Sequence, residues 1–164
     1  MPTDRVLVVD DEPRVLSSMC RCLRLAGFRV LSAGLARDAL TLCDAHSFDV
    51  VILDLIMPGM DGVELLARIR KVQPLVRSVV LSGKIDEDLA ERDIARKLRE
   101  SVEADAYLSK PVSGTRLVET VRGVIVKDPP GDWKAIAKRM SNGKDLKIKT
   151  AKDAAKELKK FRKK

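Results

Sequence analysis

The sequence predicts an α/β domain, a doubly wound parallel sheet of five strands covered by helices on both faces. Up to residue 126, short aliphatic runs alternate with longer apolar stripes at helical spacing, and five such pairs follow one another. The best aliphatic runs are continuous rather than alternating, as expected for strands buried on both sides. Apolar residues make up 45% of the chain and aromatic residues only 3%, which predicts a core of aliphatic side chains.

The predicted strands are short runs rich in leucine and β-branched residues. They cover residues 5–9, 29–32, 50–53, 78–81 and 106–108. Between them, apolar residues recur at helical spacing. In the first predicted helix Val15, Met19 and Leu23 share one face, and Gly27 supplies a stop. Similar stripes predict the second, third and fifth helices around residues 39–43, 63–69 and 117–125. The fourth, about residues 86–103, has a thin apolar stripe among many charges, so we expect it to be largely solvent-facing.

The composition changes after residue 126. The segment KDPPG at 127–131 cannot continue a helix and predicts a linker between a domain at 1–126 and a lysine-rich, helical or partly disordered appendage at 132–164. Residues 127–164 hold 14 Lys and Arg against 5 Asp and Glu, so this tail carries +9, and residues 1–126 carry −1, of the net charge of +8. Two interpretations of the tail stay open: a solvating extension, or a segment that binds an acidic protein or, without sequence specificity, nucleic acid.

The chain is expected in the cytoplasm without a membrane partner. No apolar run reaches the roughly 18–20 residues that a bilayer requires, and the N-terminus does not resemble a secretion signal. Three cysteines, an odd number in a chain without an export signal, are expected to be reduced.

Polar residues follow four of the five predicted strands. In a doubly wound sheet, ligands bind outside the carboxyl ends of the strands, so we expect these side chains to converge. They are Asp10, Asp11 and Glu12 after the first strand, Asp54 after the third, Ser82 and Gly83 after the fourth, and Ser109, Lys110 and Pro111 after the fifth.

This set of side chains predicts a phosphate-binding pocket. Three carboxylates at one point repel one another unless a cation neutralises them. With carboxylates, backbone carbonyls and water as ligands, Mg²⁺ fits better than zinc. Lys110, a compact charge on a long stem, suits a phosphoryl or carboxylate oxygen.

These segments resemble the receiver domain of two-component response regulators, in particular the chemotaxis-regulator type. The match rests on the aspartate pair after the first strand, LDLIMPGMDG around Asp54, Ser82-Gly83, and YLSKP at 107–111, and it covers residues 4–126. The resemblance implies a flavodoxin-like sheet with the strand order 2-1-3-4-5.

The resemblance also implies roles for the site residues. Asp54 would be the phosphoacceptor, with Lys110 binding the phosphoryl group rather than the cation. Ser82 and Tyr107 would be the switch residues that respond to phosphorylation. The Mg²⁺ ligands would be Asp10, Asp11, Asp54 and the backbone carbonyl of Ile56.

By this resemblance the protein works in a phosphorelay and is not an enzyme beyond its own phosphoryl transfer and dephosphorylation. The donor would be a sensor histidine kinase or a histidine phosphotransfer protein, and a homodimer would form through the helix 4 to helix 5 face. An alternative is a phosphatase of the aspartyl-phosphate type. Such enzymes usually carry a second carboxylate two residues after the nucleophile, where this chain has Ile56. Neither Ile56 nor Lys84 could align a water, so we expect a long-lived phosphoryl state.

Overall fold

The structure of the chain is a computed structural model that describes residues 4–83, 100 and 103–126. Almost all of the predicted fourth helix, together with Lys84, lies outside the described residues. So do the predicted linker and the lysine-rich appendage at 127–164. The boundary at residue 126 and the nature of the tail therefore stay predictions.

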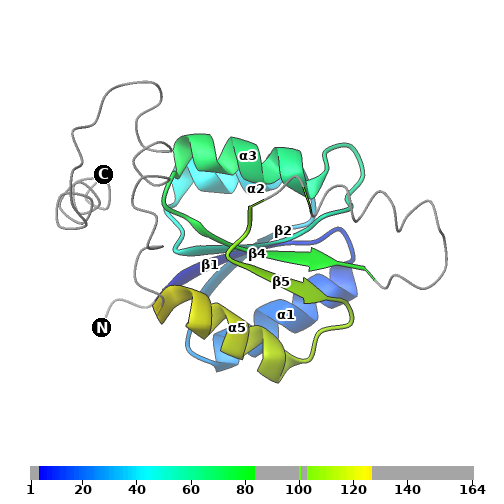
Figure 1. Ribbon diagram of the computed structural model, residues 1–164, viewed down its shortest axis with the longest axis vertical. Coiled ribbons are helices and arrows are strands. Elements are labelled where there is room, and N and C mark those ends of the chain that lie inside the picture. Colours follow the sequence, from blue (N-terminus) through cyan, green and yellow to red (C-terminus); the bar gives the residue numbers. More distant parts are fainter. Residues whose placement is uncertain (1–3, 84–99, 101–102, 127–164) are drawn as a thin grey trace.

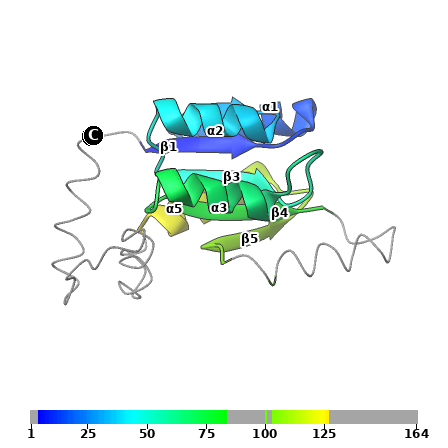
Figure 2. The same cartoon turned by 90° about the horizontal axis from the view of Figure 1, so that it is seen from above.

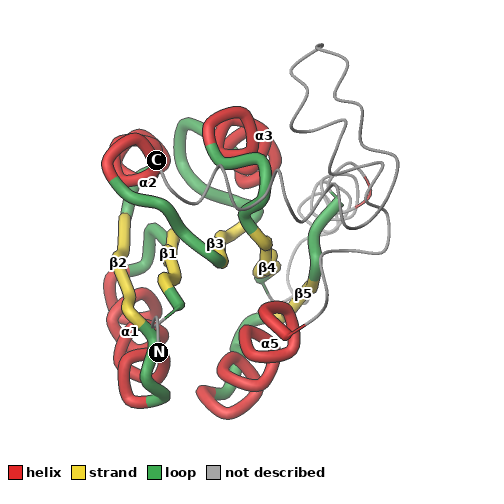
Figure 3. Tube along the Cα trace, turned by 90° about the vertical axis from the view of Figure 1, so that its left-hand side faces the viewer, coloured by secondary structure: helices red, strands yellow, loops and turns green. Residues whose placement is uncertain are grey.

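Five parallel strands form one sheet in the order β2-β1-β3-β4-β5, which confirms the expected topology (Figure 3). Each strand agrees with its predicted range to within one residue at either end. The strands are β1 (Arg5–Val9), β2 (Arg29–Ala33), β3 (Val50–Asp54), β4 (Arg77–Ser82) and β5 (Ala106–Ser109).

Helices cover both faces of this sheet. The described helices are α1 (Pro13–Leu25), α2 (Ala36–Ala45), α3 (Gly62–Val72) and α5 (Gly114–Val126). Helices α2 and α3 lie on one face, and α1 and α5 lie on the other (Figure 1). Figure 2 shows β1, β3, β4 and β5 following one another across the sheet below α2 and α3. None of the helices in the described ranges is long and apolar enough to cross a membrane.

Two hydrophobic cores lie on the two faces of the sheet. Successive residues of a strand point to opposite faces, so β3 sends Val51 and Leu53 into one core and Val50 and Ile52 into the other. All five residues of β3 are buried, as the continuous apolar run predicts. The α2–α3 core adds Ala39, Cys43, Leu65, Leu66 and Ile69, and the α1–α5 core adds Met19, Cys20, Leu23, Leu117, Val121 and Val124.

Local signals explain where the helices begin and end. Pro13 stands at the start of α1, where its missing N–H costs nothing. Gly27, at φ +97°, lets the chain turn back after α1 and enter β2. Asp61 caps α3, since its side chain accepts a hydrogen bond from the backbone N–H of Glu64 at 2.8 Å. The carboxyl ends of β1 and β3 lie at one edge of the sheet because the two strands pair in parallel.

Candidate metal and phosphoryl site

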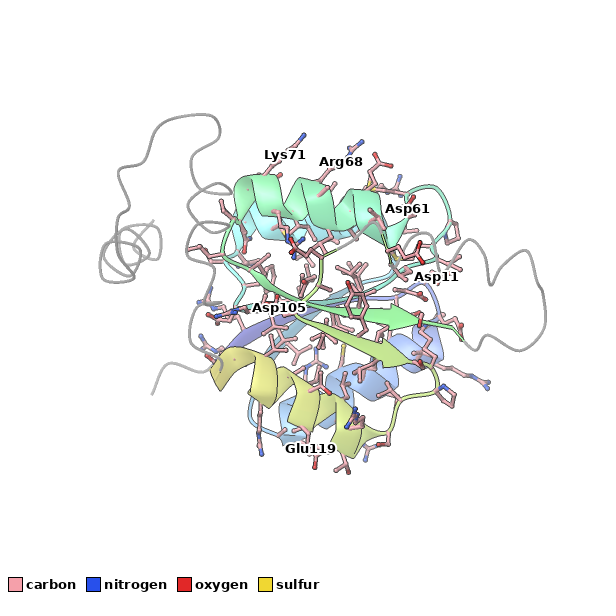
Figure 4. The ribbon with its side chains drawn as sticks, in the orientation of Figure 1. Asp11, Asp61, Arg68, Lys71, Asp105 and Glu119 are labelled. Atoms are coloured by element: carbon pink, nitrogen blue, oxygen red, sulfur yellow. The ribbon has the colours of Figure 1, made fainter. Side chains whose placement is uncertain are left out.

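Three carboxylates meet at the carboxyl ends of β1 and β3. These strands are neighbours, with Val9 opposite Leu53, so the residues that follow them lie close together. One carboxylate oxygen from each of Asp10, Asp11 and Asp54 lies within 4.8 Å of the others. Asp10 is fully buried and Asp54 is only 6% exposed. Asp11 is exposed at this end of the sheet (Figure 4).

Asp10 is fixed by the turn from β1 into α1. Its N–H donates to the carbonyl of Ala33 at the end of β2, at 3.2 Å. Its Oδ1 accepts from the N–H of Glu12 at 2.9 Å. These two bonds leave Oδ2 of Asp10 directed at Lys110, whose Nζ lies 2.6 Å away.

Asp54 is held through both of its carboxylate oxygens. Oδ1 accepts from the N–H of Ile56 at 3.2 Å, and Oδ2 accepts from Nζ of Lys110 at 2.6 Å. The loop after Asp54 packs closely beneath it, because a Cβ on Gly62 would stand 2.3 Å from the backbone oxygen of Asp54. Only glycine allows this approach.

Lys110 therefore contacts Asp10 as well as Asp54. The sequence predicts that Lys110 contacts the phosphoryl group rather than the cation. In the structure its ammonium lies between two buried acids, where a bound cation would also be attracted. Its own N–H donates to the carbonyl of Ser82 at 2.7 Å, which fixes the lysine to the end of β4. The Lys110–Pro111 peptide bond is cis.

Burial and hydrogen bonds shift the pKa of two groups in this pocket, Asp54 and Lys110. Burial raises the pKa of Asp54, and its hydrogen bond from Lys110 offsets this only in part. Burial alone would lower the pKa of Lys110, but its hydrogen bonds to Asp10 and Asp54 outweigh that effect and raise it. The lysine therefore stays charged, and the acids remain short of positive charge.

The remaining predicted site residues lie at different distances from this pocket. Ser82 is buried at the end of β4, one residue beyond the partner of Asp54 in the sheet. Tyr107 is 37% exposed, and its hydroxyl accepts from the N–H of Ala104, which precedes β5. Ile56 has a 45% exposed side chain beside the pocket. The roles predicted for these three residues stay predictions.

The residues present fit a hard divalent cation. The cluster offers oxygen ligands only, it carries more acid than base, and Lys110 already stands where a positive charge is needed. Carboxylate oxygens at this spacing suit Mg²⁺ better than a metal that prefers nitrogen or sulfur.

Comparison with known proteins places this geometry in a family. The family model of the response regulator receiver domain matches residues 6–122. The transcriptional regulatory protein TcrA of Mycobacterium tuberculosis is 31% identical over 127 residues, which cover 76% of this chain and 47% of TcrA. The transcriptional regulatory protein PrrA of the same organism is 36% identical over 123 residues, 74% of this chain and 49% of PrrA.

A solved structure agrees with these matches. The signal receiver domain of an HD domain-containing protein from Pseudomonas fluorescens superposes with a TM-score of 0.64 at 31% identity, covering 75% of this chain and 94% of that one. This chain spans about half the length of the two curated relatives. The sheet order, the acid cluster at its carboxyl edge and the match over residues 6–122 show that the chain belongs to the family of response regulator receiver domains of two-component systems.

Proposed function

We propose that this receiver domain accepts a phosphoryl group on Asp54 from a histidine kinase or a histidine phosphotransfer protein and thereby controls a downstream partner. The observation that carries the proposal is the state of the Asp54 carboxylate. It is nearly buried at the end of the central strand, its Oδ1 is held by the N–H of Ile56, and its Oδ2 is held by Lys110. An ionised oxygen in a fixed direction is what a nucleophile requires.

The transfer is balanced in atoms and charge. An oxygen of Asp54 forms a bond to phosphorus as the phosphorus–nitrogen bond of a phosphohistidine breaks, and the electron pair leaves with the imidazole nitrogen. Asp54 needs no general base, because it is already ionised. Such transfers spread charge over three phosphoryl oxygens, so positive groups in the pocket supply much of the catalysis. Lys110 is positioned to bind one of these oxygens.

We infer that Asp10, Asp11 and Asp54, with the backbone carbonyl of Ile56, would hold Mg²⁺ in this pocket. A bound Mg²⁺ supplies positive charge to the acids and to the phosphoryl oxygens. Asp10 is directed at the pocket by its bonds to Ala33 and Glu12, and Asp11 approaches from the solvent side. Lys110 contacts Asp10 and Asp54, so its ammonium would share these two acids with the cation.

The phosphatase alternative finds little support at this site. Residue 56 would have to act as an acid or base for a substrate other than the chain itself, and its side chain is an exposed isoleucine. We propose instead that the protein catalyses only its own phosphorylation and dephosphorylation. An apolar side chain at this position cannot align an attacking water, which supports a slow loss of the phosphoryl group. Replacement of Ile56 by Asn should accelerate that loss.

The test is the Mg²⁺-dependent reaction of the full chain with acetyl phosphate, followed by intact mass and peptide mapping. One phosphoryl group should be added at Asp54, and Asp54→Asn should abolish the reaction. Asp61→Asn is the matched control, because Asp61 is a nearby acid outside the cluster and asparagine preserves its helix cap. A label on His46 or on a serine would reject the assignment.

A further inference from the structure

A second polar cluster lies at the amino end of β4 and β5, opposite the end that carries Asp11 (Figure 4). Asp105 directly precedes β5, and its Oδ2 accepts from the backbone N–H of Ser78 at 2.8 Å. The N–H of Asp105 donates in turn to the carbonyl of Ser78 at 3.0 Å. Arg77 Nη1 lies 3.5 Å from Asp105 Oδ1, with the two side chains only 16% and 18% exposed. These contacts hold Asp105 against the start of β4.

Arg70 of α3 joins this cluster from above the sheet. Its Nη2 donates to the hydroxyl of Ser78 at 3.1 Å and also to the backbone carbonyl of Glu103. Ser78 is fully buried, so its hydroxyl is a fixed anchor. One guanidinium group therefore ties α3, β4 and the segment that enters β5 together.

The hydroxyl of Tyr107 contacts the segment at residues 103–105, which Arg70 and Ser78 hold in place. It accepts from the N–H of Ala104 at 3.2 Å, and Ala104 stands between Glu103 and Asp105. Both neighbours are anchored, one by Arg70 and the other by Ser78. In this orientation, which we call outward, the tyrosine side chain is 37% exposed.

We propose that Arg70 is a positioning residue for Tyr107. By holding the carbonyl of Glu103, Arg70 keeps the N–H of Ala104 where it binds the phenolic oxygen, and so it sets the population of the outward orientation. The proposal rests on the proposed function in one respect, that the orientation of Tyr107 is coupled to phosphorylation of Asp54. If outward Tyr107 belongs to the unphosphorylated state, weakening its anchor favours the phosphorylated state by thermodynamic linkage.

The chain offers a specific probe, because Tyr107 is its single tyrosine. Full-length protein labelled with 3-fluorotyrosine gives one ¹⁹F resonance. We expect Arg70→Met to move this resonance in the unphosphorylated protein toward the position that wild type adopts with beryllofluoride and Mg²⁺. Arg70→Lys, which keeps a charge and a donor, should move it less in the same direction. Arg68→Met is the control, since Arg68 points away from the sheet and pairs with Glu64 on its own helix (Figure 4).

A second measurement separates positioning from a general loss of stability. Loss of an anchoring hydrogen bond should raise the apparent affinity for beryllofluoride about three- to tenfold in Arg70→Met. A merely destabilised protein would bind it less tightly. An unchanged resonance in a folded Arg70→Met protein, or a shift away from the beryllofluoride position, would overturn the proposal. If Arg70→Met does not fold, Arg70→Gln, which also removes the guanidinium group, takes its place with the same two outcomes.

The outcomes for the two proposals differ. A wild-type resonance that does not respond to beryllofluoride, together with an unlabelled Asp54, counts against the proposed function. The displacement of the Tyr107 resonance by Arg70→Met in the unliganded protein tests the positioning role on its own.

Discussion

The two ends of the sheet carry polar clusters that differ in charge balance. At the carboxyl end, three acids, Asp10, Asp11 and Asp54, lie together, and among the described residues the ammonium of Lys110 contacts two of them, Asp10 and Asp54. At the amino end, Asp105 faces Arg77, and the guanidinium of Arg70 binds neutral acceptors. Acid in excess of base leaves affinity for a further cation, whereas an ion pair and hydrogen bonds to neutral acceptors serve to fix the chain. Acidic and basic side chains thus form a candidate cation site at one end of the sheet and hold the chain in place at the other.

Gly62→Ala should have the largest effect, because the added methyl group would collide with the backbone at the carboxyl end of β3. The added methyl would stand 2.3 Å from the backbone oxygen of Asp54 and 2.9 Å from Cα of Leu55, and backbone cannot yield as a side chain does. We expect a loss of about 3 kcal/mol in the free energy of unfolding and slower phosphorylation. Gly123→Ala in α5, where nothing lies within 4 Å, should instead stabilise by about 0.5–1 kcal/mol. Urea unfolding of both variants measures the contrast, and equal effects would contradict it.

Removing the ammonium of Lys110 should show how far the stability of the protein depends on a positive charge beside the buried acids. In Lys110→Met the buried acids lose the cation that neutralises them, so we expect the metal-free protein to lose about 2 kcal/mol of stability. Mg²⁺ should restore more stability in this variant than in wild type, because no ammonium competes for Asp10 and Asp54. Thermal unfolding with and without Mg²⁺ gives the comparison, with Lys71→Met on the outer face of α3 as the control. A smaller response to Mg²⁺ in Lys110→Met would refute competition.

Neutral substitutions at the two ends should have opposite signs. Asp105→Asn loses the charge that faces Arg77, at a cost of about 1 kcal/mol. At Asp54, burial raises the pKa, so the ionised form costs stability at neutral pH, and this cost disappears as the pH falls through the raised pKa. Asp54→Asn removes the charge and should raise the free energy of unfolding by up to about 1 kcal/mol. Urea titration at pH 7 measures the free energy of unfolding of both variants. If both were stabilised or both destabilised, the contrast between the two clusters would be refuted.

The smallest effect concerns a buried thiol away from both clusters. Burial, with Asp44 nearby, raises the pKa of Cys43 to about 11. Because the folded pKa exceeds the unfolded value of about 8.5, the stabilisation is complete below that value and declines as the pH rises toward the folded pKa. Cys43 should account for about 0.8 kcal/mol of stability lost between pH 7.5 and pH 9. Cys43→Ala should flatten this decline in the free energy of unfolding, measured by urea titration across this pH range, and an unchanged decline would contradict the assignment.

Much of the carboxyl-end site was predictable because it depends on where strands end. A buried run such as residues 50–53 marks its own boundaries, and parallel strands bring Asp10 and Asp54 to one edge. The unequal burial of Asp10 and Asp11 was not predictable, since it follows from the bond between Asp10 and Ala33 of another strand. The contact of Lys110 with Asp10 likewise depends on distances across the whole sheet.

The amino-end cluster left no local signal in the sequence. Arg70 reads as one of several charges on a helix, and its partner Glu103 is 33 residues away. A backbone carbonyl as acceptor is invisible in a pattern of side chains. Positioning contacts of this kind emerge only when α3 and the segment before β5 are placed together.

The two cores also differ in when they can form as the chain leaves the ribosome. Among the described residues, the buried members of the α2–α3 core all lie between Leu7 and Val80, so they can pack before the last strand and α5 are synthesised. The other face joins α1, near the start, to Val121 and Val124 of α5. The apolar side of α1 must therefore wait for about a hundred further residues before α5 can cover it, which takes about 5–20 seconds at typical synthesis rates of about 5–20 residues per second. We expect the nascent chain to depend on chaperones most in that interval.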